Sequence, residues 1–391
     1  MSNIQLRNVS EAENILYTID REKLPFSPTY TKHPLVGTET RSVPFTANFG
    51  ETTTVKIPMG AHFITDITLR IELPALTPSS GSVVSWTNAI GFALIQSVQL
   101  TCEDVVIDTI NSYTLDFEDE FDKEGTGALA GKEDIFNSMN ERIEPRTIYI
   151  PLKFWFTRRL DQALPVGCID DKLHLVIRLR KLDGLVLYDG DDLPNVHGTL
   201  GATAMVKYHW VDDVLFRSFK RRKLNYVIQK RQFASYKIPS TTEQTLSLDL
   251  EGPIRKLRWA FVDDASLENN DYFNYNVRTQ GSIDPSSSPA SVAFMDSATL
   301  RTAGNEVLTG DEIFFRKLST ARPNTSTRSI YSIDFDVKYV PSTLNFSRAD
   351  DCVLDIKYRD NSPSHRVMLV AYSYGFLSIE DGCITTFSES C

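Results

Sequence analysis

The chain has 391 residues, of which 41% are hydrophobic and 24% are charged, proportions that are typical of a globular protein with a large core. Its net charge of −10 argues against a global attraction to nucleic acid. No apolar run reaches the roughly 18 residues that span a bilayer, and the first residues lack the pattern of a signal peptide, so we expect a protein that is made and used in the cytosol.

The cysteines are scattered along the chain, at Cys102, Cys168, Cys352, Cys383 and Cys391. Their number is odd and none belongs to a C-x-x-C pair, so we expect free thiols rather than a disulfide framework or a zinc site. Most should be buried, and the terminal Cys391 should be exposed.

The elements predicted along the chain are mostly half-buried strands, in which apolar and polar residues alternate with a period of two. A helix is predicted at 10–19, and strands with one apolar face are predicted at 67–73, 173–179, 246–250 and 333–339. Further helical candidates are 112–124 and a turn or two at 157–164. The pattern is typical of antiparallel sheets with one face in a core.

Stretches rich in Pro, Gly, Ser and Asp separate these elements, and we expect them to be surface loops. They lie at 74–83, 187–197, 279–293 and 320–329. Many strands at short spacing with such turns indicate a β-sandwich or jelly-roll architecture. An eight-stranded jelly roll needs about half of this length, so two in tandem fit the chain.

A basic cluster marks the expected division between the two halves. It is the densest run of positive charge in the chain and contains Arg217, Lys220, Arg221, Arg222 and Lys223. One interpretation is a solvated linker between domains. The other is contact with an acidic partner surface, such as anionic lipid or a scaffold protein. The sequence leaves both open.

The segment Ile150–Pro165, IPLKFWFTRRLDQALP, does not fit a strand with one wet face. Its residues 154–156 are three consecutive aromatic rings, so in an extended chain Trp155 points away from the two phenylalanines. We therefore predict that both faces are buried here. Arg158 and Arg159 are expected to begin a short helix or turn at a rim, where acidic groups can reach them.

No motif predicts catalysis. The histidines, which are His33, His62, His174, His197, His209 and His365, form no metal-ligand pair, and neither a nucleophile elbow nor a P-loop is present. The glycine-rich GTGALAG at 125–131 follows an acidic run that would repel phosphate, and DGDD at 189–192 lacks the spacing of a calcium loop. We predict no catalytic, cofactor-binding or metal-ligating residue, and no enzyme.

Four segments, taken together and in this order, resemble the major capsid proteins of nucleocytoplasmic large DNA viruses and related viruses. They are IPMGAHFITDITLRIELP at 57–74, WTNAIGFALIQSVQLTCEDVVIDTINSYTLDFEDEF at 86–121, YIPLKFWFTRRLDQALP at 149–165, and STLNFSRADDCVLDI at 342–356 with AYSYGFLSIEDG at 371–382. A hairpin that is usually glycine-rich in the family reads TCEDVVID here. The chain is also short for the family, which implies reduced outer loops.

The resemblance implies an all-β fold of two tandem eight-stranded antiparallel jelly rolls with a few short helices. We expect an N-terminal arm (1–27), a first jelly roll (28–215), a basic linker (216–224) and a second jelly roll (225–391). The implied function is that of a major capsid protein, whose homotrimeric, pseudo-hexameric capsomers assemble in the host cytoplasm and tile an icosahedral shell. The implied partners are the chain itself, minor capsid or scaffold proteins and an internal membrane surface, without direct nucleic-acid binding.

Two other functions stay open from the sequence. A carbohydrate-binding β-sandwich, such as a lectin or attachment module, predicts an exposed aromatic platform, and Tyr272, Phe273 and Tyr275 are its candidates. An enzyme of the cupin or glycosidase type needs a histidine cluster or a carboxylate pair in a cleft, and no spacing in the sequence singles one out.

Overall fold

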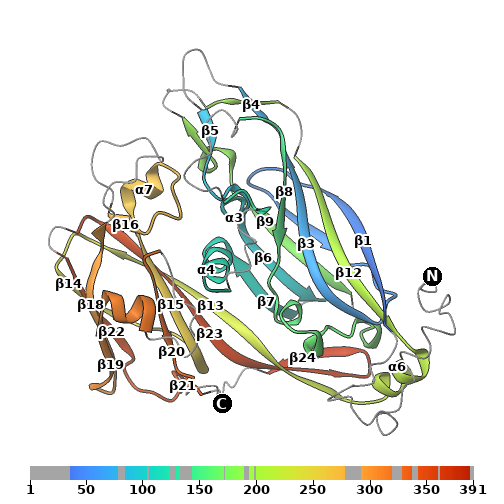
Figure 1. Ribbon diagram of the computed structural model, residues 1–391. Coiled ribbons are helices and arrows are strands. Elements are labelled where there is room, and N and C mark those ends of the chain that lie inside the picture. The colour runs from blue at the N-terminus through green and yellow to red at the C-terminus, as the bar shows by residue number, and fades with distance from the viewer. Residues whose placement is uncertain are drawn as a thin grey trace, which may run out of the picture.

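Two β-sandwiches stand side by side in the molecule (Figure 1). The computed structural model describes residues 36–77, 84–103, 105–122, 129–132, 143–170, 172–188, 193–197, 200–277, 292–318, 328–336, 342–359 and 362–387. The helix predicted at 10–19 and most of the loop predicted at 279–293 lie outside these residues, as do 320–327 of the loop predicted at 320–329.

The first sandwich consists of two four-stranded antiparallel sheets. One has the order β1 (Val36–Thr46), β12 (Gly201–Val211), β3 (Phe63–Leu73) and β8 (Arg146–Pro151). The other has the order β2 (Thr52–Lys56), β9 (Leu173–Leu179), β6 (Ile95–Cys102) and β7 (Val105–Asn111). Counted along the chain, these eight strands have the orders 1-8-3-6 and 2-7-4-5, which is a jelly roll.

The second sandwich repeats this strand order. Its first sheet contains β13 (Leu224–Ile238), β23 (His365–Glu380), β15 (Pro253–Asp263) and β20 (Ile330–Asp334), and its second contains β14 (Glu243–Ser247), β22 (Val353–Tyr358), β18 (Met295–Thr302) and β19 (Asn305–Asp311). The short strands β21 (Leu344–Asn345) and β24 (Cys383–Phe387) extend the first sheet, and β16 (Asn276–Val277) pairs with β17 (Val292–Ala293). The predicted all-β fold with two jelly rolls is confirmed.

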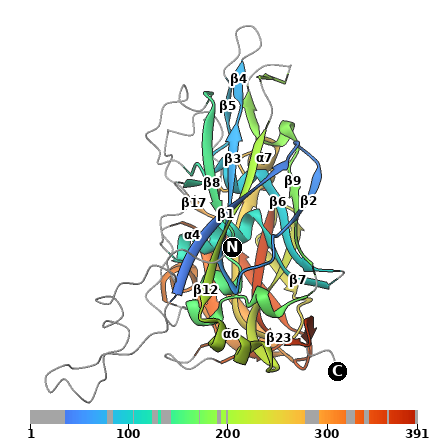
Figure 2. The same ribbon diagram turned by 90° about the vertical axis from the view of Figure 1, so that its right-hand side faces the viewer.

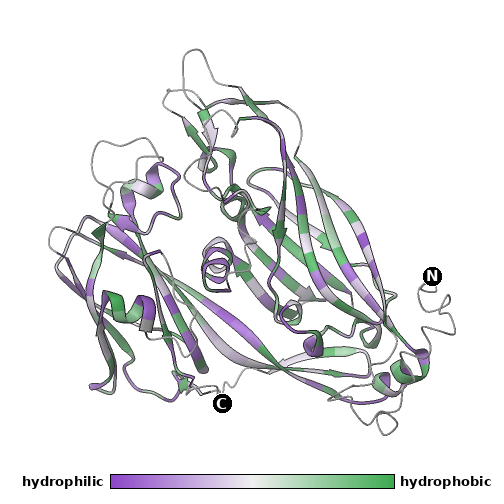
Figure 3. Cartoon of the chain, viewed as in Figure 1, coloured by the Kyte–Doolittle hydropathy of each residue, from purple (hydrophilic) through white to green (hydrophobic). Residues whose placement is uncertain are grey.

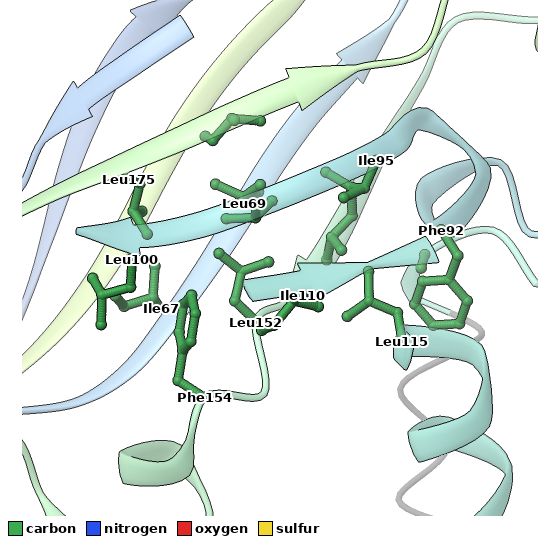
Figure 4. Close-up of a cluster of buried hydrophobic side chains, with 14 of the residues drawn as sticks. Ile67, Leu69, Phe92, Ile95, Leu100, Ile110, Leu115, Leu152, Phe154 and Leu175 are labelled. Atoms are coloured by element: carbon green, nitrogen blue, oxygen red, sulfur yellow. The ribbon is translucent and has the colours of Figure 1, made fainter. Parts of the chain in front are cut away.

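The predicted alternation appears in several strands. In β3, Ile67, Leu69, Ile71 and Leu73 are buried while Glu72 is exposed, and the same banding is visible along the sheet in Figure 3. β9 coincides with the strand predicted at 173–179, whereas β14 ends at Ser247 and overlaps only residues 246–247 of the strand predicted at 246–250. Figure 4 shows the resulting core, where side chains from β3, β6, β7 and β9 meet.

The strand predicted at 333–339 is confirmed only at its start. β20 begins earlier and ends at Asp334, so the prediction is wrong at 335–336, and residues 337–339 lie outside the described residues. Asp336 instead turns to Arg255, whose Nε donates to its carboxylate at 2.9 Å, and it accepts the backbone N–H of Ser342 at 3.2 Å. The backbone N–H of Phe335 still donates to the carbonyl of Arg255 at 3.0 Å, so the chain stays beside β15 just beyond the end of β20.

Two stretches that were predicted as loops contribute short strands. β4 (Ala75–Thr77) pairs with β11 (Asn195–His197), and β5 (Val84–Trp86) pairs with β10 (Val186–Tyr188). The loop prediction is therefore wrong at 75–77, 187–188 and 195–197, whereas β5 lies just beyond the loop predicted at 74–83. Residues 78–83 and 189–192 of the same stretches lie outside the described residues.

Strands β15 and β23 are buried on both faces. Along β23, Leu369 and Ala371 belong to the core of the second sandwich, whereas Val370 and Tyr372 belong to the apolar cluster that fills the first. Trp259 and Ala260 divide in the same way along β15. One face of this sheet therefore fills the second sandwich, and the other face packs against the first.

Within the described ranges, few helices connect the strands. They are α3 (Ile90–Leu94), α4 (Ser112–Asp122), α6 (Asp213–Lys220), α7 (Asp264–Glu268), the π-helix η7 (Phe314–Leu318) and short 3-10 turns. α4 confirms the helix predicted at 112–124. α6 joins β12 to β13 at the end of the molecule that lies opposite β4 and β5 (Figures 1 and 2).

Candidate functional site: the interface between the sandwiches

Helix α4 lies between the two sandwiches (Figure 1). Asn111 begins it, because its Oδ1 accepts the backbone N–H of Thr114 at 2.8 Å, as an N-cap residue does. Nine of the eleven residues are buried, among them Asp116, Glu118 and Asp119. A helix that is buried on all sides must find partners for its carboxylates inside the protein.

Arg231 of β13 reaches this helix from the second sandwich. Its Nη1 donates to Oδ2 of Asp108 at 2.5 Å and its Nε donates to Oε1 of Glu118 at 2.8 Å, while Nη2 donates to the carbonyl of Lys153. The side chains of Arg231, Asp108 and Glu118 are at most 2% exposed. Arg158 brings a second cation to Glu118, also at 2.8 Å.

The electrostatics of this cluster favour charged side chains. Burial raises the pKa of Glu118, but Arg231 and Arg158 outweigh it, so the pKa lies below its ordinary value. At Asp108 burial is the larger effect and the pKa is raised despite Arg231. Burial opposes the charge of Arg231, yet Asp108 and Glu118 raise its pKa further above the ordinary value. Arg231 is therefore a permanent cation between two carboxylates.

A second ion cluster ties α4 to the loops of the second sandwich. Asp116 accepts hydrogen bonds from Nη1 of Arg328 at 2.8 Å and from the hydroxyl of Tyr275 at 2.5 Å, and Nζ of Lys132 lies 3.2 Å away. Burial raises the pKa of Asp116, but the charges of Arg328 and Lys132 lower it more, and the pKa lies below its ordinary value.

The two clusters have a mechanical role rather than a chemical one. Removing one member of a buried ion pair leaves an uncompensated charge and costs about 3–5 kcal/mol. Because the partners lie in different sandwiches, that energy fixes the position of one sandwich against the other. The arrangement offers no reacting group that faces an open cleft.

Aromatic rings complete the interface, and their burial tests the interpretation of the protein as a carbohydrate-binding module. Phe273 meets Tyr113 of α4 edge to face with ring centroids 6.0 Å apart, and Tyr275 meets Phe117 at 5.8 Å. Tyr272, Phe273 and Tyr275 are all buried. The interpretation of these rings as an exposed carbohydrate platform is therefore wrong, because they pack against the first sandwich.

The aromatic run at 154–156 is buried, but it is not extended. β8 ends at Pro151, and Trp155 begins a 3-10 turn, so the prediction of an extended segment is wrong. The rings of Phe154 and Phe156 stack at 5.6 Å, and Trp155 meets Phe156 edge to face at 5.0 Å. The 3-10 turn spans Trp155–Thr157, and Phe154 precedes it with an extended backbone. All three rings belong to the apolar cluster that fills the first sandwich.

The two arginines that follow this run differ. Arg158 reaches the buried carboxylate of Glu118, as predicted for an acidic group on the same chain. Arg159 pairs with Asp161 at 2.5 Å, and both side chains of that pair are well exposed. The short 3-10 turn Leu160–Gln162 confirms the turn predicted here.

The predicted basic cluster lies on α6 and in the turn after it, and all five side chains are exposed. Nζ of Lys220 is 3.6 Å from Asp170, and Nζ of Lys223 is 2.7 Å from Glu380. On the same helix Val214 is 74% exposed. This end of the molecule therefore combines exposed cations with an exposed apolar side chain.

The metal-ligating types of side chain and the cysteines form no site among the described residues. Among the described residues, no group of three or more His, Cys, Asp and Glu side chains is arranged to hold a metal ion. Cys102, Cys168 and Cys352 are buried free thiols as predicted, and Cys383 is exposed. Cys391 and the DGDD stretch lie outside the described residues. In the part of the chain that the structure describes, no helix is long and apolar enough to cross a membrane.

Residues 29–234, just over half of the chain, match the family model described as "Major capsid protein N-terminus". The chain belongs to this family of major capsid proteins. It is 23% identical over 378 residues to the major capsid protein of Pyramimonas orientalis virus, covering 89% of this chain and 90% of that protein. It is 27% identical over 168 residues to the major capsid protein of Spodoptera frugiperda ascovirus 1a, which is 41% of this chain and 35% of that protein. The match thus spans about a third of the ascovirus protein's length.

Solved structures show the same fold. The PBCV-1 virus capsid protein superposes with a TM-score of 0.77 at 18% identity, covering 92% of this chain and 98% of that chain. The Faustovirus major capsid protein superposes with a TM-score of 0.72 at 12% identity, covering 91% and 93%. The predicted resemblance to capsid proteins of large DNA viruses is confirmed.

Proposed function

We propose that this chain is a major capsid protein whose homotrimers, with six jelly rolls and a nearly hexagonal outline, tile the shell of a large DNA virus. One observation carries the proposal: two sandwiches of the same strand order are fixed side by side by a buried interface. Three such chains place six similar bodies around a ring, and a hexagonal outline can tile a surface. The count of three comes from the family resemblance.

The contact between the sandwiches has a direction that supports a ring. It uses β7 and α4 of the first sandwich and β13 and β23 of the second. The surface that the first sandwich contributes differs from the surface that the second sandwich contributes. The second sandwich of one copy can therefore make the same kind of contact with the first sandwich of the next copy. Head-to-tail contacts of this sort close into rings when the rotation fits.

For partners, we propose that the α6 end meets an acidic surface inside the shell, either a minor capsid or scaffold protein or an internal anionic membrane. The exposed Arg217, Arg221 and Arg222 support it, together with the exposed Val214. The net charge of −10 favours no direct contact with the genome. Co-sedimentation with anionic and neutral vesicles, for the wild type and a variant with the three arginines changed to alanine, tests the membrane partner.

The proposal also carries the domain limits expected from the sequence, 28–215 and 225–391 around the linker 216–224, and assembly in the host cytoplasm. It assigns no catalytic, cofactor-binding or metal-ligating residue.

Light scattering of the purified protein tests the capsomer. The expected mass is three times that of the 44.2 kDa chain, with hexagonal particles in electron micrographs. A particle with the mass of one chain at every concentration contradicts the trimer. Glycan binding by such a monomer points instead to a carbohydrate-binding module.

A further inference from the structure

The two sandwiches repeat each other in register along one hairpin. Ser97 pairs with Asn111 between β6 and β7, and Ser297 pairs with Asp311 between β18 and β19, so equivalent positions lie 200 residues apart. Both ladders shift register at the same place, after Leu100 and after Leu300. The residues that turn the two hairpins, Glu103 and Ala303, share positive φ angles of 46° and 48°.

Equivalent positions differ in what covers them. Tyr113 at the start of α4 is 7% exposed because it packs against the second sandwich, whereas its counterpart Ile313 is 53% exposed. Ile107 of β7 is 2% exposed, and its counterpart Val307 of β19 is 43% exposed. The second sandwich thus has exposed apolar side chains at positions whose counterparts in the first sandwich are buried. Nothing else in the described chain lies over them.

The residue that receives Tyr113 within the chain is Phe233 of β13. The two rings stack with centroids 5.9 Å apart and planes at 5°. In its sheet, Phe233 pairs with Val370 of β23, which in turn pairs with Arg258 of β15.

The equivalent series of strand pairings in the first sandwich leads to Ser42. β3 and β15 are both eleven residues long, and Thr68 of β3 holds the position of Arg258. Thr68 pairs with Met205 of β12, and Met205 pairs with Ser42 of β1. Ser42 is therefore the counterpart of Phe233, and it is exposed.

An open groove lies at this position of the first sandwich. It is lined by Glu39, Arg41, Ser42, Val43, Pro58, Met59 and Gly60. A Cβ added to Gly60 would meet no atom within 4 Å, so the groove is open there. In the second sandwich, Gln232 and Glu251 close the matching place with two hydrogen bonds, of 2.6 and 2.8 Å.

We propose that the β1 groove receives Ile313 from a second copy of this chain, and that β19 and η7 of one copy pack on β1 and β12 of the next. The proposal rests on the proposed function, because it places the contact between copies in the trimer. Two independent features meet in it, an exposed apolar side chain on one surface and an open groove at the matching position of the other.

The chemistry of this contact differs from that inside the chain. Where Asp108 faces Arg231 within the chain, the counterparts are Leu308 and Thr40. Neither that carboxylate nor that guanidinium is repeated at these positions. The charged residues that line the groove, Arg41 and Glu39, pair with each other at 3.0 Å.

Cross-linking tests the contact in the full chain. In a background with Cys383→Ser and Cys391→Ser, Ile313→Cys and Ser42→Cys are combined and treated with a short bismaleimide. The matched control combines Val106→Cys with Ser42→Cys, because Val106 is exposed on the equivalent hairpin of the first sandwich. We expect a covalent species of three chains for the first pair only. A second test is Ile313→Asp, which should reduce the mass in solution from three chains to one, with Val106→Asp as its control.

The outcomes separate this inference from the proposed function. A trimer that does not cross-link through the cysteines introduced by Ser42→Cys and Ile313→Cys, and that keeps its mass in Ile313→Asp, overturns the contact but leaves the capsomer. A wild type that is monomeric at every concentration overturns the capsomer itself. Cross-linking by the control pair as well also counts against the contact, because it shows collisions without a preferred surface.

Discussion

At the scale of single residues, Arg231 has the largest influence on the arrangement of the molecule. It lies on a strand of the second sandwich, yet its guanidinium binds two carboxylates and a carbonyl of the first. Every one of these partners is buried or half-buried, so water cannot replace the guanidinium if it is removed. The contact is therefore worth far more than an ion pair on the surface.

Arg231→Met should lower the free energy of unfolding by about 3–5 kcal/mol, because Asp108 and Glu118 stay buried without their shared cation. Denaturant unfolding measures the change. Arg159→Met is the matched control, since Arg159 forms an exposed pair with Asp161, and such pairs contribute about 0–1 kcal/mol. Equal losses in the two variants contradict the role of the buried cluster.

His365 should make the second sandwich sensitive to acid. Its ring is buried among Phe261, Phe294 and Tyr358, and its Nδ1 lies 2.7 Å from the carbonyl of Pro363. Burial lowers the pKa of His365 below the ordinary value of about 6.5.

The unfolded chain therefore takes up this proton at a higher pH than the folded chain. Stability from His365 is complete above about pH 6.5 and falls as the pH drops from there toward the folded pKa. Between about pH 7.5 and 5.5, the melting temperature of the wild type should fall more than that of His365→Phe. Parallel falls in both proteins show that His365 carries none of the effect.

At the scale of elements, alternation predicted β3 and β9 because each has one buried face and one wetter face. It did not single out β15 and β23, whose two faces enter two different cores, since burial on both sides erases the alternation. Burial on two faces was instead assigned to 154–156. There, the backbone passes from an extended Phe154 into a 3-10 turn at Trp155, and the three rings share one core. Period-two reasoning does not apply to that geometry.

Trp155→Ala should cost about 3–5 kcal/mol of unfolding free energy, because the indole is 2% exposed and packs edge to face on Phe156. Thermal unfolding measures the loss, and light scattering reports whether assembly changes. Leu160→Ala is the control, because Leu160 lies in the next 3-10 turn but is 70% exposed, and its effect should stay within about 0.5 kcal/mol. An unchanged melting temperature for Trp155→Ala contradicts burial of the ring.

At the scale of the whole molecule, the fold could be predicted but the interface could not. The resemblance and the strand pattern predicted two jelly rolls. The partners of α4 are distant in sequence: Arg231 lies 113 residues from Glu118, and Arg328 lies 212 residues from Asp116. Acidic residues within a buried helix indicate that arginine or lysine side chains must pair with them. No local sequence pattern predicts which strand or loop supplies those side chains.

The two sandwiches should unfold together. Tyr372 and Val370 enter the cluster of the first sandwich while their neighbours on β23 fill the second, so neither body can open without exposing apolar surface of the other. Scanning calorimetry should therefore record one transition for the full chain. Two separated transitions, with one sandwich melting while the other stays folded, contradict this coupling.

The position of β23 near the end of the chain has a consequence during synthesis. The first sandwich is translated well before β23, whose Val370 and Tyr372 enter the apolar cluster of that sandwich. A product that stops before His365 therefore lacks this cover. Such a fragment exposes apolar surface that the full chain buries, so we expect it to aggregate.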